Sequence, residues 1–219
     1  MKPINTYYKK IWQSQQIPAL LAAFTLFLLA IRAGFTKRPE YLFLLWNLFL
    51  AWVPYAISEL LPVTNNRKWY FIGIPAWLAF FPNAPYIITD FYHLRQHDYA
   101  PIWVDVALLF WTAGSGLLLG LLSIRNMEKI LSGYFSNKVI DAAIHVVLFA
   151  SAFGIYAGRY LRWNSWDLVT DPHSIARDIK QLLLHPADNF RTAGITLTFG
   201  ALMTTCYIIM KKLRENSEA

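Results

Sequence analysis

Residues 17–34 read IPALLAAFTLFLLAIRAG, an almost unbroken apolar run that is long enough to cross a membrane. A helix needs about 20 mostly apolar residues, within a range of roughly 17 to 25, to span the hydrocarbon layer. Further stretches of this kind recur along the chain. The sequence therefore predicts an all-α membrane protein, a bundle of about six transmembrane helices at about 17–34, 41–61, 69–89, 102–124, 138–160 and 192–210.

The composition agrees with this class. The chain is 56% hydrophobic with a mean hydropathy of +0.34, and 15% of its residues are charged, whereas soluble domains carry about 25%. The net charge of +7 comes from basic residues scattered over short loops, so no nucleic-acid module is expected. One cysteine, Cys206, excludes an internal disulfide and a cysteine-based metal cage. Without a repeat, linker or low-complexity segment, residues 1–219 are expected to form a single domain.

The distribution of lysine and arginine indicates the orientation. With the N-terminus inside, the inner segments hold eleven of the 20 basic residues, and cytoplasmic loops carry the excess. Lys9 and Lys10 precede the first apolar run as in a signal peptide, but no small-residue cleavage motif follows. We expect a retained first helix and both termini in the cytoplasm.

The long connection at about 161–191 is predicted to contain its own helix. Asp171 followed by Pro172 is an N-cap and a first-turn proline. Apolar residues then recur on one face for about 13 residues, up to His185 and Pro186. Such a segment is too short to span the membrane. It either lies in the interface or packs over the bundle as a re-entrant cap, and the two alternatives are about equally open. The apolar face consists of Ile175, Ile179, Leu182 and Leu183.

With this topology, the connections between helices 3 and 4 and between helices 5 and 6 lie on the same, outer side. They hold four of the five histidines and six of the thirteen acids, and ionisable groups near membrane depth tend to be functional. The first polar motif is FPNAPY at 81–86. Pro82 and Pro85 remove helical donors, so the third helix should kink or unwind there, and Asn83 could satisfy some of the freed backbone groups.

If that helix resumes, Tyr86, Asp90, His93 and His97 share one face. Asp90 and His93 could then share a metal ion or a proton. In the alternative interpretation, Asp90 caps the broken helix and His93 lies at headgroup level.

The second polar motif is GRYLRWNSWD at 158–167. Arg159 and Arg162, one turn apart at the end of the fifth helix, present two guanidinium groups that suit a phosphate or carboxylate. Asn164 and Asp167 follow in a turn. The alternative is a pair of snorkelling arginines beside a structured turn.

Other ionisable residues have more ordinary interpretations. Asp105, about one turn into the fourth helix, needs a partner, and Arg159 or Arg162 is the expected one, in an ion pair or in a site. Asp141 and His145 are expected to form a local pair. The sequence contains no nucleophile elbow, metalloprotease motif, phosphate loop or dinucleotide fingerprint.

The two motifs resemble those of a family of bacterial integral membrane proteins known as a domain of unknown function. Its recurring marks are a Phe-Pro-Asn-Ala-Pro-Tyr-x-x-Thr-Asp stretch and a Gly-Arg-x-x-Arg-x-Asn-Ser-Trp-Asp stretch, here 81–90 and 158–167. The resemblance extends over most of the chain from the second helix onward. It implies a bacterial cytoplasmic-membrane location and no particular activity.

Three hypotheses follow. In the first, an outer-leaflet enzyme or carrier takes a lipid-linked anionic substrate: Arg159 and Arg162 hold the anion with Asn83, Asn164 and Asp105, while Asp90, His93 and Asp167 act as acid–base groups or hold a divalent metal. The expected partners are then membrane lipids and that substrate, and no nucleic acid. In the second, a small-solute transporter uses the broken third helix. In the third, a non-enzymatic assembly protein docks a partner on its outer loops.

Overall fold

A computed structural model of the chain describes residues 4–37, 40–63, 68–94, 101–184 and 190–218. Within these residues, six helical segments are long and apolar enough to cross a membrane, as predicted from the sequence, and the chain is thus a multi-pass, all-helical membrane protein. These segments are Trp12–Thr36, Phe43–Val63, Lys68–His93, Ile102–Leu131, Asn137–Leu161 and Phe190–Ser217.

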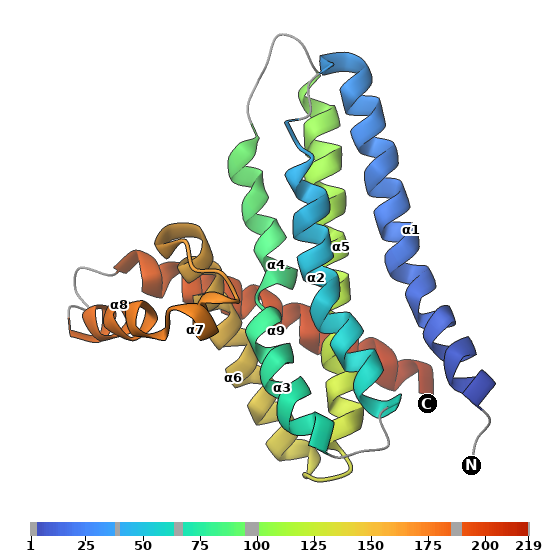
Figure 1. Cartoon of the computed structure of the whole chain (residues 1–219), viewed down its shortest axis with the longest axis vertical. Coiled ribbons are helices and arrows are strands. Elements are labelled where there is room, and N and C mark those ends of the chain that lie inside the picture. Colours follow the sequence, from blue (N-terminus) through green and yellow to red (C-terminus); the bar gives the residue numbers. More distant parts are fainter. Residues whose placement is uncertain (1–3, 38–39, 64–67, 95–100, 185–189, 219) are drawn as a thin grey trace. The chain divides into compact units, whose positions relative to one another are not determined.

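The chain divides into two compact units, Met1–Ile130 and Leu131–Ala219. The expectation of a single domain stays a prediction, and each unit is described by itself. The first unit contains α1 (Ile4–Thr36), α2 (Phe43–Leu60), η1 (Leu61–Val63), α3 (Lys68–Phe80), α4 (Asn83–Tyr86), η2 (Ile87–His93) and α5 (Ile102–Leu131) (Figure 1).

Within the first unit, α2 contacts α1, α3, α4 and η2. The third span is interrupted after Phe80, as the prolines predicted. It continues as the single turn α4 and then as the 3₁₀ segment η2. The amide of Ala84 bonds to the carbonyl of Phe81 (3.1 Å), and the freed carbonyl of Phe80 accepts a hydrogen bond from Asn83 Nδ2 (2.9 Å). Asn83 thus satisfies a backbone group at the break, as expected.

The break packs closely on α5. A Cβ on Gly116 would lie 2.5 Å from the carbonyl oxygen of Ala84, and one on Gly120 would lie 3.1 Å from Ala84 Cβ. Both glycines therefore allow the close approach that the small residues of this helix predicted. Gly114 plays no part, since nothing lies within 4 Å of the corresponding position there.

The second unit contains α6 (Asn137–Tyr156), η3 (Ala157–Leu161, a π-helical turn), α7 (Asp167–Thr170), α8 (Pro172–Leu184) and α9 (Phe190–Glu218). α9 packs against α6, where Gly200 meets the ring of Phe149. Asp141 on α6 binds Lys211 on α9, with Nζ at 2.7 Å from each carboxylate oxygen.

The predicted helix of the long connection is α8, and it has the predicted length and N-cap. The amide of Ser174 donates to Asp171 Oδ1 (3.2 Å). Ile175 is buried, whereas Ile179 is exposed, so the apolar face is covered only in part. The placement of α8 in the membrane interface stays a prediction. His185 and Pro186, which were expected to end the helix, lie outside the described residues.

Candidate functional sites

The predicted site residues fall in both units. Asn83, Asp90, His93 and Asp105 belong to the first unit, and Arg159, Arg162, Asn164 and Asp167 belong to the second. The expected convergence of the two motifs in one outer pocket therefore joins residues of two units, and it stays a prediction. Each set has its own local geometry, which decides what its members can do.

In the first unit, Asp90 is a buried carboxylate on η2. Its Oδ2 accepts a hydrogen bond from Asn47 Nδ2 on α2 (2.7 Å), and its side chain is shielded from solvent. Asn47 supplies a neutral donor to an acid inside a membrane-spanning segment, where such a group requires a partner.

His93 does not share a hydrogen bond with the Asp90 carboxylate. Its Nδ1 lies 3.2 Å from the backbone oxygen of Asp90, its ring packs on Phe43, and its side chain is exposed. The α-helical resumption on which the shared face of Tyr86, Asp90 and His93 depended does not occur, because η2 is a 3₁₀ helix. Asp90 and His93, three positions apart, still share a face of that 3₁₀ helix. His97 lies outside the described residues.

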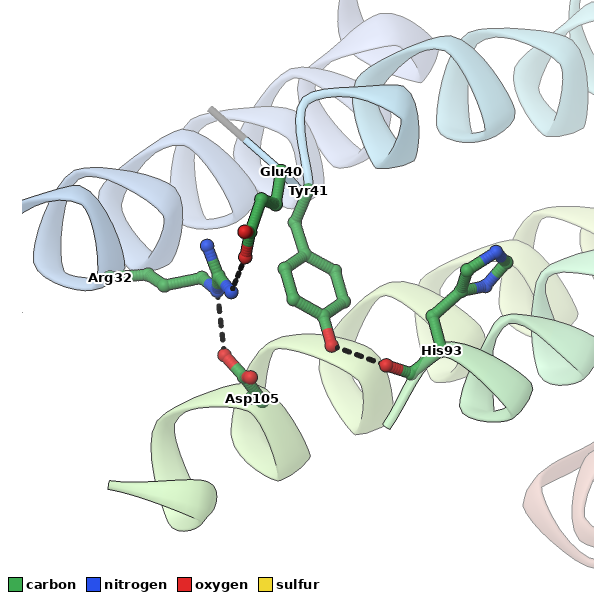
Figure 2. A network of polar contacts seen from close by, with 5 residues as sticks. All are labelled: Arg32, Glu40, Tyr41, His93 and Asp105. Atoms are coloured by element: carbon green, nitrogen blue, oxygen red, sulfur yellow. Dashed lines mark hydrogen bonds and ion pairs between the residues drawn. The ribbon is translucent and has the colours of Figure 1, made fainter. Parts of the chain in front are cut away.

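Asp105 is paired with a residue that sequence reasoning missed. The expected partner was Arg159 or Arg162. The structure instead gives it Arg32 on α1, whose Nε donates to Asp105 Oδ1 at 2.7 Å. Figure 2 shows Arg32 between Asp105 and Glu40, with Nη2 at 2.9 Å from Glu40 Oε2. The sequence did hold a signal, since Arg32 lies inside the first apolar run, where a charge needs a partner. Arg32 was counted only among the basic residues of the outer segments.

Tyr41 joins this ion pair to the broken helix. The guanidinium carbon of Arg32 lies 4.1 Å from the centre of the Tyr41 ring, a cation–π contact. The Tyr41 hydroxyl donates to the backbone oxygen of His93 (2.9 Å), at the end of η2 (Figure 2). Tyr41 lies between the first two spans. Burial, and then the Asp105 charge, raise the pKa of its hydroxyl to about 12. The hydroxyl therefore stays a hydrogen-bond donor over the physiological range.

In the second unit, the arginine motif folds into a turn, residues 158–167, that we call the arginine turn. The helix α6, which forms most of the fifth span, does not end regularly. It widens into the π-helical turn η3, and Arg162 then takes a left-handed conformation with φ 60°. The predicted regular helical turn between Arg159 and Arg162 was wrong for this reason. π-Turns often occur at functional sites, and a left-handed residue other than glycine is uncommon.

Two side-chain contacts hold the arginine turn in place. Asp167 Oδ2 accepts hydrogen bonds from the backbone amide (2.7 Å) and the side-chain amide (3.2 Å) of Asn164. The indole of Trp163 donates to Asp178 Oδ2 on α8 (2.9 Å). The structured turn weighed as an alternative is thus present, and Asn164 and Asp167 help to build it. A direct role for either in binding or acid–base chemistry stays a prediction.

Arg159 and Arg162 differ in exposure. Arg159 is half-buried within η3, while Arg162 is exposed. Among the residues that the structure describes, no acid pairs with Arg162. A search of the described residues for three or more neighbouring His, Cys, Asp or Glu side chains that could hold a metal finds none. The expected divalent metal thus has no support from geometry here.

The fold and the two polar regions define a multi-pass helical membrane protein with a buried ion-pair network in one unit and an exposed arginine turn in the other. The model of the family described as "Protein of unknown function (DUF1361)" matches residues 46–206. The chain belongs to this family, in agreement with the resemblance of its two motifs. No curated protein and no solved structure matches the chain.

Proposed function

We propose that the arginine turn binds an anionic group that carries a phosphate or a carboxylate, with Arg159 and Arg162 as its ligands. One observation carries this proposal: Arg162 is exposed, unpaired within the described chain, and held in a left-handed conformation. That conformation costs roughly 1–2 kcal/mol for a residue with a side chain. Backbone strain of this kind concentrates at ligand sites, where the surrounding structure maintains it.

The contacts around Arg162 support binding because they fix the turn before a ligand arrives. Asn164 is tied to Asp167, and Trp163 is tied to Asp178. A preformed site loses less conformational entropy on binding than a mobile loop does. A guanidinium can hold two oxygens of a phosphate or carboxylate at once. In the predicted orientation, this site faces the outer leaflet of a bacterial cytoplasmic membrane.

The test measures binding to the purified full-length chain in detergent micelles, with glycerol 3-phosphate and a long-chain phosphatidic acid as probes and diacylglycerol as the uncharged reference. Arg162→Gly keeps the left-handed backbone and removes the charge. We expect it to weaken binding of both phosphate probes by about tenfold or more, since a hydrogen bond to a charged group contributes about 1.5–3 kcal/mol.

Lys37 provides the matched control. Among the described residues, it is the other non-glycine residue with a positive φ, which is 53°. Lys37 follows α1 in the first unit. Lys37→Gly makes the same chemical change at a helix end outside the arginine turn, so binding should be unchanged. Equal affinity of wild type and Arg162→Gly for the phosphate probes would refute the proposed function.

A second candidate, a small-solute transporter, is favoured by the break in the third span. Discontinuous helices line substrate and ion sites in many carriers, and here the break precedes the buried Asp90–Asn47 pair. In proteoliposomes loaded with a pH-sensitive dye, a proton flux that Asp90→Asn abolishes would support it. Flux no greater than that of protein-free vesicles would remove the proton-coupled form.

A further inference from the structure

Three exposed apolar side chains, at the end of the arginine turn and on α7, are not explained by the binding of an anion. Trp166, Leu168 and Val169 have exposed fractions of 45%, 48% and 84%. All three lie outside the six candidate spans, so their exposure does not follow from a place in the lipid-facing wall of the bundle. We call these three residues the α7 patch.

Backbone hydrogen bonds show how the chain turns between the end of the fifth span and the α7 patch. The amide of Trp163 bonds to the carbonyl of Ala157 (3.2 Å), about one helical turn before the span ends at Leu161. The amide of Asp167, the first residue of α7, bonds to the carbonyl of Asn164 (3.0 Å). The chain therefore turns directly after the end of the span, and α7 begins six residues beyond Leu161. At the end of a span, hydrocarbon gives way to headgroups.

Residues around the α7 patch match that level. Tyr160 and Trp166 are exposed aromatic side chains at the end of a span, where amphipathic rings are enriched. Arg177 and Lys180 are exposed on α8, and basic residues beside an apolar surface favour anionic lipids. The hydrogen bond from Trp163 to Asp178 ties α8 to the arginine turn.

We infer that the ligand of the arginine turn is a lipid whose anionic headgroup lies at Arg162 and whose hydrocarbon chains lie on the α7 patch. The inference rests on the proposed function and narrows its substrate class from any anionic group to a phosphate- or carboxylate-bearing amphiphile. Arg162 and the α7 patch lie within eight consecutive residues, 162–169. One amphiphilic molecule can therefore contact both.

The experiment compares two phosphate probes that differ in their chains, long-chain phosphatidic acid and glycerol 3-phosphate, on the full-length protein in detergent micelles. The variant Leu168→Ser/Val169→Ser removes apolar contacts and leaves Arg159 and Arg162 in place. We expect it to weaken phosphatidic acid binding by about tenfold or more and to leave glycerol 3-phosphate binding unchanged. Arg162→Gly should weaken both.

Phe135→Ser is the matched control. Phe135 has an exposed fraction of 54%, lies in the connection between Leu131 and Asn137, and is likewise outside the spans. Its replacement should change neither probe. If wild type prefers phosphatidic acid and only the α7 patch variant loses that preference, the lipid inference holds.

Two results would overturn the inference. Equal affinity for both probes, unaffected by the serine pair, would leave an anion site without a lipid and would keep the proposed function. A serine pair that changes the oligomeric mass in native mass spectrometry, with phosphatidic acid binding intact, would show that a second copy of the chain covers the α7 patch. Failure of Arg162→Gly to weaken either probe would instead remove the proposed function itself.

Discussion

The break in the third span and the arginine turn are both irregular ends of membrane helices, yet they treat their charges in opposite ways. In the first unit, Asp90 on η2 after the break and Arg32 on α1 are buried, and each has a partner within 2.9 Å. In the arginine turn, Arg162 is exposed in a strained conformation while its neighbours Asn164 and Asp167 bind each other. A paired, buried charge holds helices together, whereas an exposed charge on a fixed turn is available to a ligand.

This contrast divides the chain's two polar motifs by role. FPNAPY and the acid after it form a packed joint between α2, α5 and η2, in which Gly116 and Tyr41 also take part. GRYLRWNSWD forms a surface turn. The sequence analysis expected Asp105 to pair with the arginine motif. In the structure Asp105 binds Arg32 instead, so it belongs with the buried charges of the first unit.

The largest expected effect comes from breaking the buried ion pair. Arg32→Ala leaves Asp105 buried without its guanidinium and should lower the free energy of unfolding by about 3–5 kcal/mol. The double variant Arg32→Met/Asp105→Leu should recover most of the loss, because no uncompensated charge remains. Denaturant titration in micelles measures both, with exposed Arg177→Ala as the control. A loss below about 1 kcal/mol for Arg32→Ala would mean that the network does not stabilise the first unit.

A smaller loss is expected where α5 meets the break. Gly116→Ala places a methyl group 2.5 Å from the Ala84 carbonyl oxygen and should cost about 1–3 kcal/mol. Gly114→Ala, on the same helix with open space, should be neutral or stabilising by about 0.5–1 kcal/mol. Thermal unfolding of the two alanine variants distinguishes them. Equal stability of the two would contradict the close contact.

The Tyr41 hydroxyl should give the first unit a stability that depends on alkaline pH. Its pKa is raised from the ordinary value of about 10 to about 12 in the folded chain. The unfolded chain therefore loses this proton first, and the contribution is complete below pH 10 and lost as pH rises through 12. Unfolding followed between pH 9 and 12 should show this decline, and Tyr41→Phe should reduce it. An unchanged pH profile in Tyr41→Phe would assign the decline to other groups.

The smallest effect concerns strain and has the opposite sign. Arg162→Gly and Lys37→Gly should each raise the free energy of unfolding by about 1 kcal/mol or less, since glycine adopts a positive φ without the steric cost of a side chain. Only Arg162→Gly should also lose phosphate binding. Thermal shift and binding measured on the same samples would show this. A destabilised Arg162→Gly would mean that the arginine contributes more through packing than its strain costs.

Local features of the chain made much of this fold predictable. Apolar length defined six spans, because a helix must satisfy its backbone inside a membrane. Pro82 and Pro85 predicted the break after Phe80, since a proline removes a donor whatever surrounds it. Asp171 and Pro172 likewise predicted the start of α8, because an N-cap and a first-turn proline act within a few residues.

Other features depend on residues far apart in sequence, and only the tertiary structure decided them. Arg32 and Asp105 are 73 positions apart, and Asn47 and Asp90 are 43 positions apart, so no local pattern could pair them. The conformation of Arg162 was also out of reach, because a left-handed arginine opposes local preference and is held there by its surroundings. Hydropathy and proline act locally and determined the helices from sequence. Partners and backbone strain arise from packing, and they decided which charges are buried and which remain open to a ligand.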